Sequence, residues 1–164
     1  MDRDWNCFRL LESMKTDTGM ARQKTNQLLN SVLISMSRSF LQYVSESSPW
    51  VRGDAASVGR EVEVLAARQR QDVAAIAQFL DQRESFVDFG SFPTEYTDLQ
   101  FLALNSLLTG IVRSQRGNCE NLQRALLTEA ITEDAEAERL LTQVLGYEQD
   151  LLKSLGDLAA ANAA

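Results

Sequence analysis

The segment SFVDFGSFPTEY, residues 85–96, lies between two long helical patterns and decides how the helices can be arranged. Gly90 and Pro93 interrupt any helix here. The segment also carries four aromatic side chains, which favour a packed connection over a free linker. In extended form these residues reach about 40 Å at ~3.3 Å per residue, and a helix of about 27 residues is also about 40 Å long. The segment can therefore run along a full helical bundle from one end to the other.

Apolar residues spaced three and four apart predict four long helices around this connection. We expect these helices at about residues 21–46, 55–84, 97–127 and 133–158. The connections between the first two and the last two are short, so each should join antiparallel neighbours. No segment alternates apolar and polar residues as a half-buried strand would. The sequence therefore predicts an all-α fold, a four-helix bundle with one long crossover between the second and third helices.

The chain begins with a separate amphipathic pattern. Trp5, Phe8, Leu11 and Met14 recur at helical spacing. They predict a short helix that the DTG sequence at residues 17–19 should end. We expect residues 1–19 to form an extension, residues 20–159 the bundle and residues 160–164 a frayed tail. The apolar side chains of the extension, together with Trp50 and the aromatic crossover, could form a dimer face.

The composition excludes several classes of partner. The 164-residue chain has a net charge of -7, so it lacks the basic surface that nucleic-acid binding or docking on anionic lipid needs. No apolar run approaches the roughly 20 residues of a membrane span, and the first residues lack the apolar block of a signal peptide. Cys7 and Cys119 are too far apart in sequence to suggest a disulfide framework. We expect a cytoplasmic protein that binds neither nucleic acid nor membrane.

One acidic residue interrupts the apolar face of the last predicted helix. In GYEQDLLKSL, residues 146–155, Glu148 falls on the same helical face as the leucines. A buried carboxylate needs hydrogen-bond partners or a metal ion. The inward positions of the other helices offer a phenol and two amides as partners. We therefore predict a core polar cluster, or a small-ligand pocket, formed by Tyr43, Gln69, Gln115 and Glu148.

Two stretches of the chain resemble a known family. RQDVAAIAQFL, residues 70–80, resembles the end of the second helix in the ferritin-like superfamily, the group of bacterioferritins and rubrerythrins. VLGYEQDLLKSL, residues 144–155, resembles the fourth helix of that family. With the helix lengths and the crossover, the resemblance covers residues 21–159. It implies a ferritin-like four-helix bundle, a homodimer and, in the family, a di-iron centre held by two glutamates and two Glu-x-x-His pairs.

The chain departs from this ligand pattern. It contains no histidine, and Leu151 stands three residues after Glu148, where the family has a histidine. On the second helix the matching pair is Gln69 and Asp72, so an amide replaces the usual glutamate. Two divalent ions bring four positive charges, and only Glu148 and Asp72 remain at this level to balance them. A di-iron oxidase centre is therefore not expected.

Three functions remain open. The first and preferred one is a non-catalytic ferritin-like bundle that acts through self-association or partner binding and carries no cofactor. The second is an atypical metal-binding or oxidoreductase-type protein, in which Glu148 and Asp72 hold a single divalent ion with Glu46 or Glu120 as a third acid. The third is a small-molecule carrier, whose pocket replaces the metal centre and is lined by the core polar cluster and Met36.

Overall fold

The computed structural model of the chain describes residues 3–47, 49, 56–94, 96 and 102–162, with side chains from residue 19 onwards. The helices are α1 (Arg3–Ser37), α2 (Phe40–Ser47), α3 (Ala56–Gln82), α4 (Leu104–Leu126), α5 (Glu129–Thr132) and α6 (Ala135–Ala161). No strand occurs among the described residues, which confirms the all-α prediction. Within the same residues, no helix combines the length and the apolar character that crossing a membrane requires.

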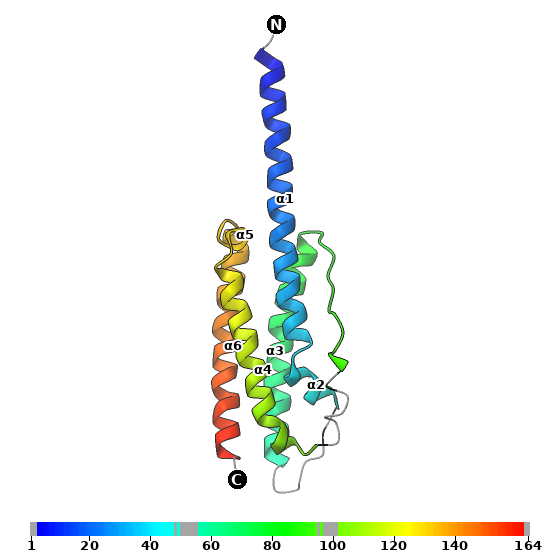
Figure 1. The fold of residues 1–164 in the computed structure, drawn as a ribbon, viewed down its shortest axis with the longest axis vertical. Coiled ribbons are helices and arrows are strands. Elements are labelled where there is room, and N and C mark those ends of the chain that lie inside the picture. Colours follow the sequence, from blue (N-terminus) through cyan, green and yellow to red (C-terminus); the bar gives the residue numbers. More distant parts are fainter. Residues whose placement is uncertain (1–2, 48, 50–55, 95, 97–101, 163–164) are drawn as a thin grey trace.

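The helices form a bundle in which α3 and α4 point in the same direction (Figure 1). Both helices start in an apolar cluster at the α2 end of the bundle and finish in a second cluster at the α5 end. Residues 83–94, which follow α3, run back along the outside of the bundle, next to α1 (Figure 1). There the amide of Asp88 donates to Asn30 Oδ1 at 2.9 Å, and Arg38 Nε donates to the carbonyl oxygen of Phe89 at 2.8 Å. The aromatic segment is therefore hydrogen-bonded to the bundle surface.

The first helix is longer at its N-terminal end than the sequence predicts. α1 is one uninterrupted helix of 35 residues, so the predicted end at residues 17–19 is wrong. A single glycine costs a helix only about 1 kcal/mol relative to alanine, and no proline is present to stop the helix from propagating. The side chains of Trp5, Phe8, Leu11 and Met14, and all of Trp50, lie outside the described part of the chain.

The same predicted helix breaks near its other end. Instead of running to residue 46, α1 ends at Ser37, and α2 begins at Phe40. Ser39 Oγ accepts a hydrogen bond from the Gln42 amide at 3.4 Å, and the Phe40 amide donates to Ser114 Oγ at 3.1 Å. Both contacts satisfy backbone groups that a new helix start leaves free. The sequence SFLQ at residues 39–42 has the capping-box spacing, and it is the signal that was missed.

The third predicted helix also starts later than expected. α4 begins at Leu104, whereas the prediction placed its start near residue 97. Residues 97–101 lie outside the described part of the chain. Residues 129–132, predicted as a turn, form the single helical turn α5. The other helix ends lie within three residues of the expected positions.

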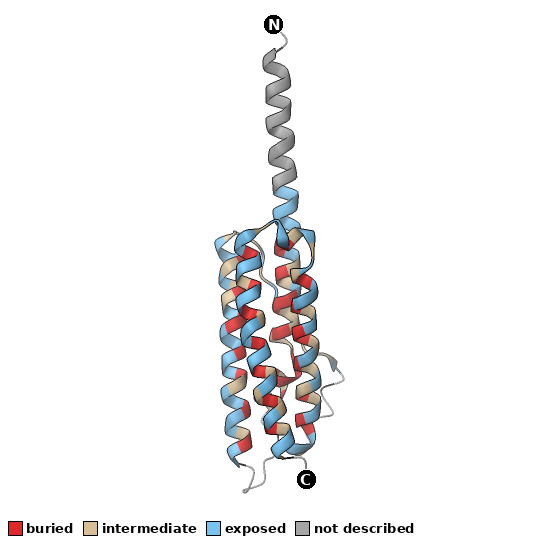
Figure 2. Cartoon of the chain, turned by 90° about the vertical axis from the view of Figure 1, so that its left-hand side faces the viewer, coloured by how far each residue is buried: buried red, intermediate tan, exposed pale blue. Residues whose placement is uncertain are grey.

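The core consists of two apolar clusters separated by a polar layer. Buried residues follow the inner faces of the helices (Figure 2). The cluster at the α2 end includes Phe40, Val58, Val62, Ile111 and Leu155. The cluster at the α5 end includes Leu29, Leu33, Leu80, Leu122, Ile131 and Leu141. Between them, α3, α4 and α6 each place polar side chains inside the bundle, and these form the candidate site.

Two glycines of α4 should respond in opposite ways to alanine. A Cβ atom at Gly110 would lie 2.8 Å from Phe40 Cε1, whereas a Cβ at Gly117 would have no neighbour within 4 Å. We expect Gly117→Ala to raise the free energy of unfolding by about 1 kcal/mol through helix propensity. Gly110→Ala should lower it by about 1–3 kcal/mol, because the Phe40 ring must move. Urea unfolding of both variants checks this, and equal effects would contradict the close contact.

Candidate functional site: a buried carboxyl pair

Glu148 lies at the centre of the polar layer and is fully buried. The apolar face of α6 turns it inward together with Val144 and Leu151. Its Oε2 accepts hydrogen bonds from Gln69 Nε2 on α3 at 2.8 Å and from Gln115 Nε2 on α4 at 2.6 Å. Side chains from α3 and α4 thus both donate to the same carboxylate oxygen of α6.

The two glutamines extend the network across the bundle. Gln69 Nε2 also donates to Gln115 Oε1 at 2.9 Å. On the far side, Gln69 Oε1 accepts from Ser39 Oγ at 2.8 Å and from Gln42 Nε2 at 3.0 Å. Gln69 is therefore the junction of the network, with partners on α4, on α6 and at the start of α2. The break between α1 and α2 is what brings Ser39 and Gln42 inside, so a prediction without that break could not include them.

The structure brings together three of the four predicted cluster residues. Gln69, Gln115 and Glu148 contact one another, but Tyr43 does not join them. The Tyr43 ring packs instead against the aromatic rings of the crossover, 5.6 Å from Phe92 and 5.3 Å from Tyr96 between centroids. Because α2 is a separate helix, Tyr43 no longer follows the inward face of α1. Including Tyr43 in the core polar cluster was therefore wrong.

Asp72 on α3 completes the site as a second acid. It is buried, and its side chain interacts with Glu148. Asp72 Oδ2 and Glu148 Oε1 are both buried, and neither has a hydrogen-bond partner among the described residues. Two ionised carboxylates would repel each other here, whereas one proton between them allows an O–H···O hydrogen bond. The arrangement favours a carboxyl pair that shares a single proton.

The surroundings shift the acid–base equilibria of this pair. Burial raises the pKa of Glu148 to about 7, against the lowering effect of hydrogen bonds from Gln115 and Gln69, and the neighbouring Asp72 raises it further. Burial also raises the pKa of Asp72, while the positive charge of Arg68 opposes that shift. Burial and the charge of Glu148 raise the pKa of the Cys119 thiol to about 11. Cys119 is thus a protonated, buried thiol and a poor nucleophile.

The residues at this level do not fit a di-iron centre. Amides stand at two of the inward positions, and each is already engaged with Glu148. Glu46 and Glu120, which could have supplied a third acid, are both exposed. Among the residues that the structure describes, no group of three or more His, Cys, Asp or Glu side chains could hold a metal ion. Only Asp72 and Glu148 remain as donors for a single ion.

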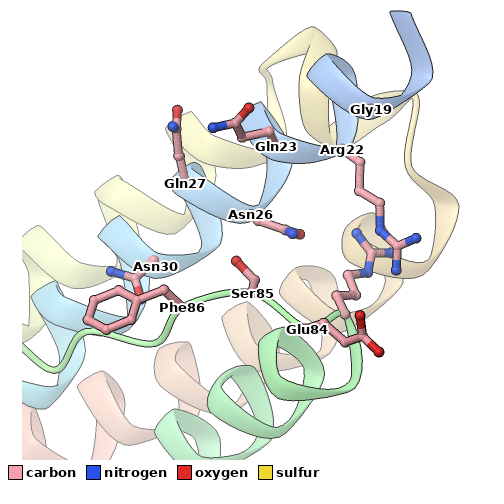
Figure 3. Close-up of a pocket in the computed structure, with 10 residues that line it drawn as sticks. Gly19, Arg22, Gln23, Asn26, Gln27, Asn30, Glu84, Ser85 and Phe86 are labelled. Carbon is pink, nitrogen blue, oxygen red and sulfur yellow. The ribbon is translucent and has the colours of Figure 1, made fainter. Parts of the chain in front are cut away.

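A polar cavity of about 570 Å³ lies apart from the polar layer, between α1 and the segment that follows α3. Asn26, Ser85 and Arg22 line it, with the Asn26 amide directed inward (Figure 3). Arg83 is also part of its wall, but its guanidinium is held by Asp134 at 2.5 and 2.8 Å and by Glu136 at 3.2 Å. Asp134 in turn caps α6 by accepting from the Ala137 amide. Arg83 therefore joins the end of α3 to the start of α6, which is a structural role.

Comparisons of the chain with protein-family models, with curated proteins and with solved structures found no match. The ferritin-like resemblance therefore stays a prediction from the sequence. The structural observations that relate to this resemblance are the order of the helices and the polar layer in the core.

Proposed function

We propose that this chain is a non-catalytic, ferritin-like helical bundle that acts by association and lacks a di-iron centre. The hydrogen bonds that fill the polar layer support the second part of this proposal. Gln69 and Gln115 donate to the one acid that matches a family ligand, so the central positions stabilise the bundle instead of presenting open coordination sites. A cytoplasmic location accords with the free thiol of Cys119.

The observation that carries the proposal of association is the length of α1. This helix continues well beyond the ends of α3, α4 and α6 (Figure 1). An isolated helix of about 12–15 residues or fewer has only marginal stability in water unless it packs against other parts of a protein. The sequence of the projecting part repeats apolar residues at helical spacing, as Trp5, Phe8 and Leu11. We propose that a second copy of the chain packs against this part to form a homodimer.

Analytical ultracentrifugation of the full chain tests the proposal. We expect a dimer for the wild type and a monomer for the double variant Trp5→Glu/Phe8→Glu, because two charges would have to be desolvated in the interface. The control Asn6→Glu/Ser13→Glu adds the same charge to the same helix away from the apolar pattern and should stay dimeric.

The same samples, purified without chelators, can be analysed for metal. We expect no stoichiometric iron. A monomeric wild type would refute self-association, and two iron ions per chain would refute the absence of a di-iron centre. Stoichiometric binding of one divalent ion, lost in Asp72→Asn, would instead support the single-ion alternative, since Asp72 and Glu148 each hold a buried carboxylate oxygen with no hydrogen-bond partner among the described residues.

A further inference from the structure

A groove of about 410 Å³ opens on the side of the bundle where α1 gives way to α2, and we call it the α2–α3 groove. Its apolar wall is formed by Val73, Ala74 and Ala77 on α3 and by Phe89 on the crossover. Phe89 is 45% exposed, so this wall is open to solvent. Small-molecule sites in proteins span roughly 300–1,000 Å³ and are mostly apolar with a few fixed polar groups. The groove has the size and the apolar wall of such a site.

Two arginines line the polar part of the groove, and both are held in place by neutral groups. Arg38 Nε donates to the carbonyl oxygens of Phe89 and Gly90 at 2.8 and 3.0 Å, and its guanidinium lies 4.7 Å from the centre of the Phe92 ring. Arg70 Nη1 donates to Gln42 Oε1 at 3.0 Å and to Ser45 Oγ at 3.3 Å.

Neither guanidinium forms an ion pair with a carboxylate of the described chain. Each keeps N–H groups that these contacts do not use, since a guanidinium has five. The positions of Arg38 and Arg70 are thus fixed before any ligand arrives, which lowers the entropic cost of binding.

The charged side chains that line the groove favour an acidic ligand. The chain as a whole carries a net charge of -7, yet this groove is lined by two cations and one anion, Glu46. Glu46 and Arg70 are exposed, whereas Arg38 is half-buried, so the cations outnumber the anion and one of them is partly shielded from water. A ligand that complements the groove needs an acid group for the arginines and an apolar part for the wall.

We propose that the α2–α3 groove binds a small amphiphilic carboxylate, a molecule with one acid group and an aliphatic chain of medium length. The carboxylate contacts Arg38 and Arg70, and the aliphatic chain covers Ala74, Ala77 and Phe89. This site differs from the carrier pocket predicted in the bundle core, because that core is filled by the glutamine network. The proposal is independent of self-association through α1.

Isothermal titration calorimetry of the full chain with octanoate tests the proposal. We expect one octanoate per chain, with much weaker binding of 1-octanol, which lacks the charge, and of acetate, which lacks the apolar part. Arg38→Met and Arg70→Met should each raise the Kd about 10-fold or more, because charge-assisted hydrogen bonds are lost. Glu46→Gln should lower the Kd roughly 2- to 5-fold by removing a repelling charge. Arg113→Met, which removes an exposed arginine of α4, is the control and should bind as the wild type does.

A further variant keeps the test valid if the arginine substitutions disturb folding. Ala74 is exposed and lies on the groove wall, so Ala74→Trp should fill the groove without removing a hydrogen bond. We expect it to abolish octanoate binding while the helical circular dichroism stays unchanged. Wild-type affinity in folded Ala74→Trp, or equal affinities for octanoate and 1-octanol, would overturn the proposal. So would a loss of dimer on Arg38→Met, since a second copy would then occupy the groove.

Discussion

Gln69→Leu should lower the free energy of unfolding by about 3–5 kcal/mol, which is the range for breaking a buried charged network. Leucine keeps a side chain of similar volume at this position. It removes the amide nitrogen that donates to Gln115 and Glu148, and the amide oxygen that accepts hydrogen bonds. Ser39 and Gln42 lose their acceptor, and Glu148 loses one of its two amide donors. Urea unfolding at pH 7 measures the effect.

Gln78→Leu is the matched control for this substitution. Gln78 lies on the exposed face of the same helix, so its replacement should change the free energy of unfolding by less than about 0.5 kcal/mol. The loss in Gln69→Leu should also be greater at pH 8 than at pH 5, because a carboxylate without its donors is stabilised by protonation. A loss below about 1 kcal/mol would mean that the network contributes little.

Glu148→Gln should remove most of the pH dependence of stability between pH 4.5 and 7. The pKa of Glu148 rises from 4.5 to about 7 on folding, so the folded state binds more protons than the unfolded state in this range. Stability therefore falls as pH rises through the range, by about 3 kcal/mol in total at ~1.4 kcal/mol per pKa unit. The raised pKa of Asp72 acts in the same direction.

In Glu148→Gln the new amide can accept from Gln69 and Gln115 and donate to Asp72, which replaces the shared proton. We expect the variant to be more stable than the wild type at pH 8 and close to it at pH 4.5. Glu120→Gln, an exposed acid on the neighbouring helix, should leave the pH profile unchanged. A wild-type profile that rises between pH 5 and 8 would contradict the shared proton.

Asp134 limits the stability of the protein at acidic pH. Its hydrogen bonds with Arg83 lower its pKa, so the stabilisation is present above the unfolded pKa and is lost as pH falls through the lower folded value. The two effects together place the stability maximum of the wild type in mildly acidic solution.

The parts of the fold that could be predicted depend on periodicity alone. The second helix was expected at about 55–84 and is found at Ala56–Gln82, because its inward positions repeat without interruption. The same periodicity placed Gln69, Gln115 and Glu148 inside the bundle on three different helices. Since all three lie at the same level between the apolar clusters, their contact could be anticipated from the sequence.

The parts that could not be predicted depend on contacts distant in sequence. A new helix begins after Ser39 partly because the Phe40 amide donates a hydrogen bond to Ser114, 74 residues away along the chain. A local pattern cannot contain that partner. Arginine, serine and phenylalanine, at residues 38–40, are each only a few tenths of a kcal/mol less favourable in a helix than alanine, so helix propensity alone does not predict the break. Tyr43 was misplaced for this reason, and Ser39 and Gln42 were missed for the same reason.

The polar layer between the two apolar clusters has a consequence for the alignment of the helices along the bundle axis. Leucine-rich faces tolerate axial sliding, because one leucine can replace another. A shift of α6 by one turn, ~5.4 Å, would carry Glu148 away from both glutamines and leave buried amides unpaired. A single polar position can fix the register of helices in this way, and here the hydrogen bonds of Glu148 with Gln69 and Gln115 favour the observed register.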